Sequence, residues 1–202
     1  MIIRALCVPE EPAVAAFMLA LSERDRYRRF CRSMTDAAIR AYLCAIDWSQ
    51  TLIVGAFDHD ARLIGMLELC DAGHSAEIAV AVAPEHRKHG VARTLLQRAL
   101  LEATGLGKER VVLTCLTENL PMRRLARSAG LAATTASSEI ESELMLEEPD
   151  LSEVVRAGTH ELVGTISYAT ALCLPSRTDL AQQLWRTPAL RNAASRMASH
   201  RD

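Results

Sequence analysis

The chain has 202 residues, of which 50% are hydrophobic and 24% are charged. This length and composition support a sizeable hydrophobic core in one domain, with room for an appendage. The formal net charge of −2 argues against a broad electrostatic surface for nucleic acid.

The chain opens on a predicted strand and a predicted helix. Residues 2–8 are largely apolar, and residues 11–21 have helical spacing with one apolar stripe formed by Ala13, Phe17 and Leu21. The first residues lack the cationic and long apolar regions of a signal peptide, and no window reaches the ~18 consecutive apolar residues of a membrane span. We therefore expect a cytoplasmic protein with no membrane or nucleic-acid partner.

A basic run and a second predicted helix follow. For the run we expect a solvated face of a helix or loop, and it consists of Arg24, Arg26, Arg28, Arg29 and Arg32. Residues 35–46 predict a helix with Thr35 or Asp36 as its N-cap. Three apolar residues would form its buried face, namely Ile39, Leu43 and Ile46.

The middle of the chain predicts three strands and a long helix. The strands cover residues 50–58, 61–70 and 75–82, and polar turns separate them. The helix opens at Gly90 and ends near Gly105. It has one continuous apolar face, which consists of Val91, Leu95, Leu96, Ala99 and Leu100.

Two more strands and a short helix complete the predicted domain. A buried strand covers residues 109–117, a helix lies between an Asn cap at Asn119 and a terminating glycine at Gly130, and a last strand covers residues 143–148. Strands dominate first and then alternate with helices. This order predicts an α/β (α+β) fold, with a mixed sheet that carries helices on both faces.

Residues 149–202 are expected to form a mainly helical C-terminal extension. Pro188 interrupts its apolar stripe, which consists of Leu180, Leu184, Trp185, Leu190 and Met197. Such a stripe predicts a tail docked on its own domain or a homodimer formed with a second copy. The break favours the homodimer, because an isolated broken helix needs substantial packing.

The spacing of cysteine and histidine predicts no metal site. Six cysteines occur without a CxxC pair, so the spacing of a zinc site and of a disulfide framework are both missing. His86 and His89 flank a turn, and no further ligands complete a set around them.

Four cationic or titratable side chains surround Gly90, namely Arg87, Lys88, His89 and Arg93. A helix start already carries partial positive charge, so cations there are unfavourable unless they meet an anion. Because Gly90 has no side chain to block an approaching group, the N–H groups from Lys88 to Arg93 are expected to cradle a diphosphate. No P-loop, dinucleotide-binding or GxSxG motif competes with this interpretation.

The segment VAVAPEHRKHGVARTLL at residues 80–96 resembles the strand, loop and helix with which the GCN5-related N-acetyltransferase (GNAT) family holds acetyl-coenzyme A. Residues 111–131 resemble the next strand of that family and its Asn-led helix. The resemblance covers about residues 1–148 as one domain, and it implies a mixed, mostly antiparallel central sheet with acetyl-CoA as co-substrate. The residues that it implies for binding are Val80, Ala81, Val82, Arg87, Lys88, His89, Gly90, Val91, Ala92, Arg93 and Asn119.

Acetyl transfer to an amine needs a base, because a lysine-like ammonium has a pKa of about 10.4 in water. Glu77 is the first candidate, since strand alternation places it with the small residues Ala79 and Ala81 just before the loop. The resemblance points to the same glutamate. Glu68 on the preceding strand is the reserve candidate, directly or through a water. The family also implies that a backbone N–H between Val80 and Val82 polarises the thioester carbonyl.

Asn119 has two roles that do not exclude each other, as a helix cap and, by resemblance, as a contact for the pantetheine arm. Ala126 departs from the family pattern, because many members have there a tyrosine that protonates the leaving thiolate. The remaining routes are departure of coenzyme A as a thiolate, or proton donation by Cys115 or a water.

The acceptor is left open by the sequence. Residues 21–43 resemble the early segment of bacterial Pat-type protein lysine acetyltransferases, and the spacing from Asn119 to Gly130 is similar to that of the same subgroup. Arg26, Tyr27 and Phe30 either border an acceptor groove or, as we expect, pin the first loop by packing Tyr27 and Phe30 into the core. The alternatives to a protein lysine are a small-molecule amine and a non-catalytic module that senses acyl-CoA.

Overall fold

A computed structural model describes residues 1–136, 139–146 and 159 of the chain, and every structural statement below concerns these residues. The expected C-terminal extension at 149–202, including its apolar stripe and Pro188, lies outside them apart from Thr159. Among the described residues, no helix has both the length and the apolar character needed to cross a membrane.

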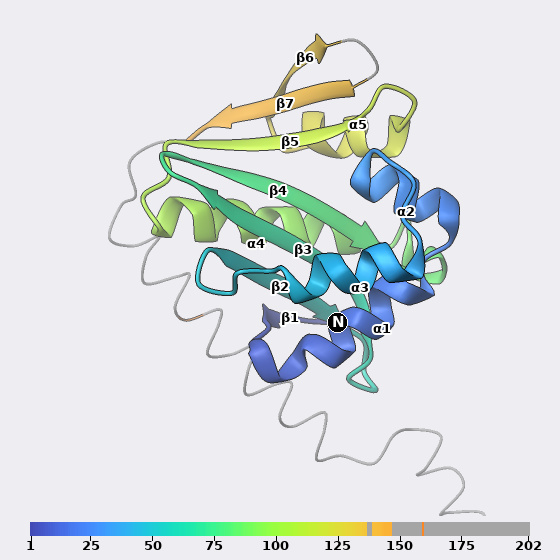
Figure 1. Ribbon diagram of the computed structural model, residues 1–202. Helices are drawn as coiled ribbons and strands as arrows, with labels where there is room; N and C mark the ends of the chain where they lie inside the picture. Colours follow the sequence, from blue (N-terminus) through green and yellow to red (C-terminus); the bar gives the residue numbers. More distant parts are fainter. Residues whose placement is uncertain (137–138, 147–158, 160–202) are drawn as a thin grey trace, which may run out of the picture.

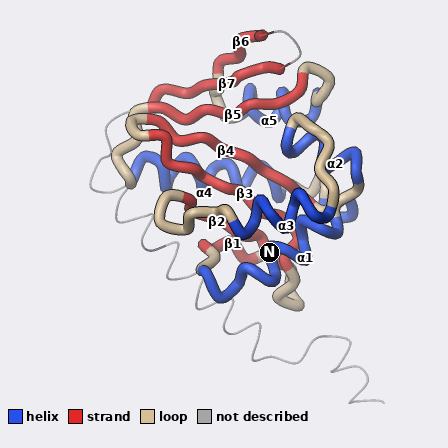
Figure 2. Tube along the Cα trace, in the orientation of Figure 1, coloured by secondary structure: helices blue, strands red, loops and turns tan. Residues whose placement is uncertain are grey.

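One seven-stranded sheet forms the centre of the molecule, with the order β1-β2-β3-β4-β5-β7-β6. Every neighbouring pair is antiparallel except β4 and β5, which run parallel (Figures 1 and 2). The strands are β1 (Ile2–Ala5), β2 (Thr51–Phe57), β3 (Leu63–Ala72), β4 (Ser75–Val82), β5 (Arg110–Leu116), β6 (Ala132–Ala136) and β7 (Glu139–Met145). The predicted mixed, mostly antiparallel sheet is therefore confirmed.

Helices cover both faces of the sheet, as predicted (Figure 1). They are α1 (Glu11–Ala20), α2 (Glu23–Phe30), α3 (Asp36–Cys44), α4 (Val91–Gly105) and α5 (Leu120–Ser128), with short 3₁₀ turns at Val8–Glu10 and Pro84–His86. Thr35 is the N-cap of α3, because its side chain accepts a hydrogen bond from the Ala38 N–H at 3.2 Å. Its predicted alternative, Asp36, is the first helical residue.

Two hydrophobic clusters hold these layers together. One contains apolar residues of β3 and β4 such as Leu67 and Ile78, together with Leu95 and Ala99 of α4 and Ala126 of α5. The other cluster joins α1 and α3 to the opposite face of the sheet. Because strand side chains alternate between faces, β4 buries Ala76, Ile78 and Val80 toward α4 and turns Glu77, Ala79 and Ala81 the other way.

Several boundaries differ from the predictions. Strand β6 was not expected, because AATTA lacks apolar alternation and is placed by its pairing with β7. Strand β7 begins at Glu139 rather than at residue 143. In α1 the buried stripe contains Val14, Phe17 and Met18, followed by Leu21, whereas Ala13 is exposed.

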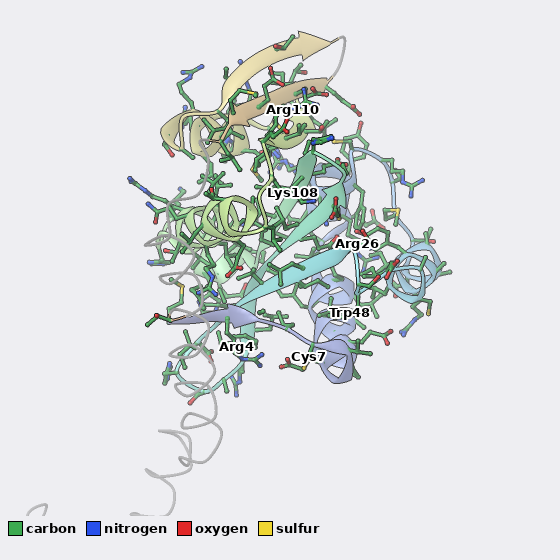
Figure 3. All side chains as sticks on the ribbon, turned by 90° about the vertical axis from the view of Figure 1, so that its left-hand side faces the viewer. Arg4, Cys7, Arg26, Trp48, Lys108 and Arg110 are labelled. Atoms are coloured by element: carbon green, nitrogen blue, oxygen red, sulfur yellow. The ribbon has the colours of Figure 1, made fainter. Side chains whose placement is uncertain are left out.

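The expectation that the basic run forms a solvated face is wrong for two of its arginines. All of the run except Arg32 lies in α2, where Arg26 is 8% exposed and donates to the carbonyls of Leu19 and Leu21 at 2.7 and 2.9 Å. Figure 3 labels Arg26. The Arg29 side chain is also 8% exposed. Tyr27, expected in the core, is 41% exposed.

Candidate functional site

Strands β4 and β5 pair at one end only. Residues Ser75 to Ile78 of β4 align with Arg110 to Leu113 of β5, and the pairing stops there. Beyond this point, within the described part of the chain, residues 79–82 pair with β3 alone. Figure 1 shows the two strands leaving a common start and diverging toward α2. The separation leaves the β5-facing backbone edge of Val80, Ala81 and Val82 without a partner strand.

The loop between β4 and α4 has an unusual backbone conformation and leaves N–H groups open at the start of α4. Lys88 and Gly90 both have left-handed backbone conformations, with φ of 62° and 82°. No side chain caps α4, and among the described residues none of the N–H groups from Lys88 to Arg93 donates a hydrogen bond to the protein. A Cβ atom at Gly90 would have no atom within 4 Å. The N–H groups from Lys88 to Arg93, where the sequence predicts an anion cradle, are therefore open amides at a helix start.

The side chains around this cradle differ in their availability. Lys88, His89 and Arg93 are exposed, as expected of groups that meet a ligand. Arg87 instead is engaged with the protein. Its Nε donates to the Val82 carbonyl at 3.0 Å, and its Nη2 lies 2.9 Å from Asp25 Oδ1 of α2.

Asp25 is a residue that the sequence did not indicate. Burial opposes the ionisation of its carboxyl, but hydrogen bonds from Arg87 and Ser22 outweigh burial and hold its pKa below the ordinary value. The loop before α4 is therefore connected to α2 through a charged pair.

Glu77 is exposed and lies on the face of β4 that points away from α4. Its backbone partners are Cys70 on β3 and Val112 on β5, in the last part of β4 that still pairs with β5. An exposed carboxylate two residues before the strands separate is accessible to a ligand that enters the open end.

Glu68 has a different environment, because its side chain is 1% exposed. Its Oε2 lies 2.8 Å from Arg29 Nη2 and accepts a hydrogen bond from the Tyr42 hydroxyl. The Nη2 group makes this contact as an ion pair without hydrogen-bond alignment. Within the described residues, Glu68 Oε1 is buried and has no hydrogen-bond partner.

The electrostatics of this cluster keep its charges in place. Burial disfavours the charged form of Arg29, but Glu68 and Tyr42 outweigh burial and raise the pKa of the guanidinium. Burial and then the negative charge of Glu68 raise the pKa of the Tyr42 hydroxyl well above its usual range. Tyr42 therefore remains a neutral donor. Neither Arg29 nor Tyr42 was expected at the site.

The helix-cap role of Asn119 is confirmed. Its side chain accepts from the Met122 N–H at 3.4 Å at the start of α5, and the residue is 6% exposed. Ala126 and Cys115 are each 1% exposed within the cluster that faces α4 and α5. Burial is the main reason why the pKa of the Cys115 thiol is raised. Cys115 is therefore poorly placed to donate a proton at the diverging strands.

Comparison with known proteins gives a family match. Residues 16–131 match the family model described as the acetyltransferase (GNAT) family. No curated protein sequence matches the chain.

Solved structures show the same fold at low identity. The chain is similar to the GNAT domain of S. lividans PAT, with a TM-score of 0.62 and 19% identity over 71% of this chain and 89% of that one. Ribosomal-protein-alanine N-acetyltransferase from Brucella melitensis gives a TM-score of 0.59 and 18% identity over 72% and 100%. Spermidine N-acetyltransferase from Vibrio cholerae, in complex with CoA and spermine, gives a TM-score of 0.57 and 21% identity over 71% and 94%.

Proposed function

The chain belongs to the GNAT acetyltransferase family, and on that premise we propose that it moves an acetyl group from acetyl-CoA to a primary amine by direct attack, with Glu77 as general base. Strand β4 supports this assignment, because it combines an exposed carboxylate, a backbone edge without a partner strand and the open amides that follow it. Along the chain, the proposed base comes first, then the edge for the pantetheine arm, and then the amides for the diphosphate.

The donor side is assigned to the loop and the start of α4. The amides from Lys88 to Arg93 would hold the diphosphate of acetyl-CoA, and the open space at Gly90 fits the close approach of an anion. Lys88 and Arg93 would supply charge from the side. Val80, Ala81 and Val82 would offer the edge that lacks a partner strand to the pantetheine arm, apart from the Val82 carbonyl, which Arg87 occupies. Asn119 would be a further contact for that arm.

Glu77 would take the proton that the acceptor ammonium must lose. The amine nitrogen then forms a bond to the acetyl carbon, and the bond between that carbon and the sulfur breaks. A backbone N–H of residues 80–82 would stabilise the charge that develops on the carbonyl oxygen. The nitrogen loses its second proton as the amide forms. Because Cys115 is buried, we propose that a water, rather than a side chain, passes this proton to the leaving thiolate.

For the acceptor we propose a lysine side chain of a protein. The resemblance of residues 21–43 to Pat-type enzymes and the fold likeness to the S. lividans PAT domain support this choice. A polyamine is the second candidate, supported by the fold likeness to spermidine N-acetyltransferase. A module that binds acyl-CoA without turnover is the alternative of another class.

Release of free thiol from acetyl-CoA by the purified full chain tests the proposal directly. A panel should contain a lysine peptide, a peptide with an alanine N-terminus, and spermidine. We expect amine-dependent thiol release, greatest with the lysine peptide. Binding of acetyl-CoA without release for any amine would favour the sensor module, and no binding at all would reject the proposal.

We also propose that residues 1–148 form the catalytic domain and that the sequence at 149–202 contributes to a homodimer, in a cytoplasmic protein. The support comes from the extent of the family resemblance and from the apolar stripe of the tail sequence.

A further inference from the structure

A buried charged cluster lies next to the proposed base, and the transfer reaction described above does not use it. It combines Arg29 of α2, Tyr42 of α3 and Glu68 of β3. The rings of Phe30 and Tyr42 pack edge to face with their centroids 5.0 Å apart. The Arg29 guanidinium carbon lies 4.9 Å from the centroid of the Phe30 ring. Three elements therefore meet at one carboxylate.

The strand register places Glu68 close to Glu77. Glu68 is opposite Ala79, and Cys70 is opposite Glu77, on the same face of β3 and β4. Diagonal neighbours of this kind lie about 7–8 Å apart across a strand pair. The pKa of the Cys70 thiol is raised mainly by burial, then by the charge of Glu68 and, more weakly, by that of Glu77. Cys70 is therefore close to both carboxylates.

Several other charges described on this face are paired, whereas Glu141 of β7 lies on it exposed to solvent. Arg110 of β5 lies on the same face as Glu77, and its Nη1 is 3.3 Å from Glu143 Oε2 of β7. Glu143 and Glu77 are both register partners of Val112, one on each side of β5. From α2, Asp25 is paired with Arg87 and Arg26 with Asp36. Arg29 and Glu68 differ from the Arg110–Glu143 pair because both of their side chains are buried, so a single substitution there leaves a buried charge without its counter-charge.

We infer that Arg29 and Glu68 form a positioning pair for Glu77, in which Arg29 cancels the charge of Glu68 and fixes α2 against β3, the strand that pairs with the one carrying Glu77. This inference rests on the proposed role of Glu77 as base. Glu68 is then not the base: its side chain is buried and held by two partners, whereas Glu77 is exposed. Cancelling the charge matters because an unbalanced charge at this distance changes how readily Glu77 ionises.

Glu68→Gln is the informative variant, because a guanidinium cannot lose its proton in a protein. Arg29 would remain cationic and would favour the ionised form of Glu77. The acid limb of the kcat/KM profile for lysine-peptide acetylation should therefore move to lower pH by about one unit. On the plateau, kcat should fall by less than about tenfold, since the base is still present.

The double variant Arg29→Met with Glu68→Gln removes both charges and should return the acid limb to its parent position. Arg29→Lys keeps the charge and should leave the limb in place. Thermal unfolding identifies the variants that fold. Should Glu68→Gln fail to fold, Glu68→Asp draws the carboxylate back from Arg29 and should shift the limb in the same direction by less.

The outcomes separate the two proposals. Glu77→Gln with parent activity would reject Glu77 as base, whatever the other variants do. If Glu77→Gln is inactive while the acid limb of Glu68→Gln stays in place, the positioning pair alone is overturned. A loss of turnover in Glu68→Gln at every pH, with Glu77→Gln active, would identify Glu68 as the base and overturn both.

Discussion

Arg87 Nη2 lies 2.9 Å from Asp25 Oδ1, so one ion pair joins the loop before α4, the proposed diphosphate site, to α2. The same guanidinium donates to the Val82 carbonyl at the end of β4. Arg87 thereby connects the strand that carries the proposed base, the cradle and the helix that lies beyond the diverging strands.

Asp25→Asn should lower the stability of the protein in a pH-dependent manner. The folded-state pKa of Asp25 is below its ordinary value of 3.8, so the ionised form stabilises the fold above that value. This contribution is lost as the pH falls through the lower folded pKa. We expect a loss of at most about 1 kcal/mol at neutral pH, since Arg87 is partly solvent-exposed.

Denaturant unfolding at pH 7 and below pH 3.8 measures this difference for the parent and Asp25→Asn. Glu23→Gln, an exposed change in the same first turn of α2, is the matched control. Equal destabilisation at both pH values would show that the lost charge is not the cause.

Gly90→Val should weaken acetyl-CoA binding by at least about tenfold, which corresponds to 1.4 kcal/mol. At a φ of 82° valine is strained, and its side chain would occupy the space through which a diphosphate reaches the amides. Isothermal titration calorimetry measures the affinity.

Gly73→Val provides the matched control for this experiment. Gly73 lies in the β3–β4 turn with a φ of 74°, and a Cβ there would also have no atom within 4 Å. It imposes the same backbone strain away from the cradle. Unchanged acetyl-CoA affinity in Gly90→Val, or an equal loss in Gly73→Val, would contradict the placement of the diphosphate.

Glu77→Gln should reduce turnover by about 100-fold to 10,000-fold, the usual contribution of a positioned general base, while acetyl-CoA binding survives. Steady-state kinetics over a pH series, together with calorimetry, separate the two effects. Glu141→Gln is the control, because Glu141 is exposed on β7 and points to the same face of the sheet. Activity within about twofold of the parent at every pH would reassign the base.

Arg26→Met should destabilise the fold by about 2–4 kcal/mol. The substitution leaves the buried carbonyl of Leu21 and the partly buried carbonyl of Leu19 without their donor and removes the 2.6 Å contact with Asp36. Arg24→Met changes an exposed arginine of the same helix and should stay within about 0.5 kcal/mol of the parent. Urea denaturation compares the two, and equal losses would refute the buried role of Arg26.

Light scattering tests the proposed homodimer. We expect the full chain to be dimeric at micromolar concentration and a chain that ends at residue 148 to be monomeric, because the truncation removes the apolar stripe of the tail. A monomeric full chain would exclude the dimer. A dimeric truncated chain would exclude the tail as its cause.

The elements that the sequence predicts well are those with a clear local pattern. Strand β4 was predicted with its observed bounds, because strict alternation ends at a turn on one side and at Pro84 on the other. Helix α4 was predicted because its apolar face begins directly after Gly90 and continues to Gly105.

What the sequence did not predict depends on partners that are distant in the chain. The buried face of α2 contains Arg26 and Arg29, which look solvated until their partners at residues 19–36 and 68 are known. Their spacing of three with an apolar Phe30 alongside was the available signal. The separation of β4 from β5 likewise depends on where the two strands stop pairing, and neither strand's own sequence predicts that point.

The parallel pairing of β4 with β5 also has a consequence for the order of folding. Strands β2, β3 and β4 are joined by short turns, whereas residues 83–109 must cross over before β5 can align with β4. Pairings that close long loops form slowly, because the entropy of closure is lost before the contacts are gained. The open end between β4 and β5 is therefore expected to assemble among the last parts of the domain. A nascent chain that stops short of β5 would then contain Glu77 and the loop before α4 but not the strand on the other side of the open end. Binding of a thioester should therefore appear only when β5 has paired with β4.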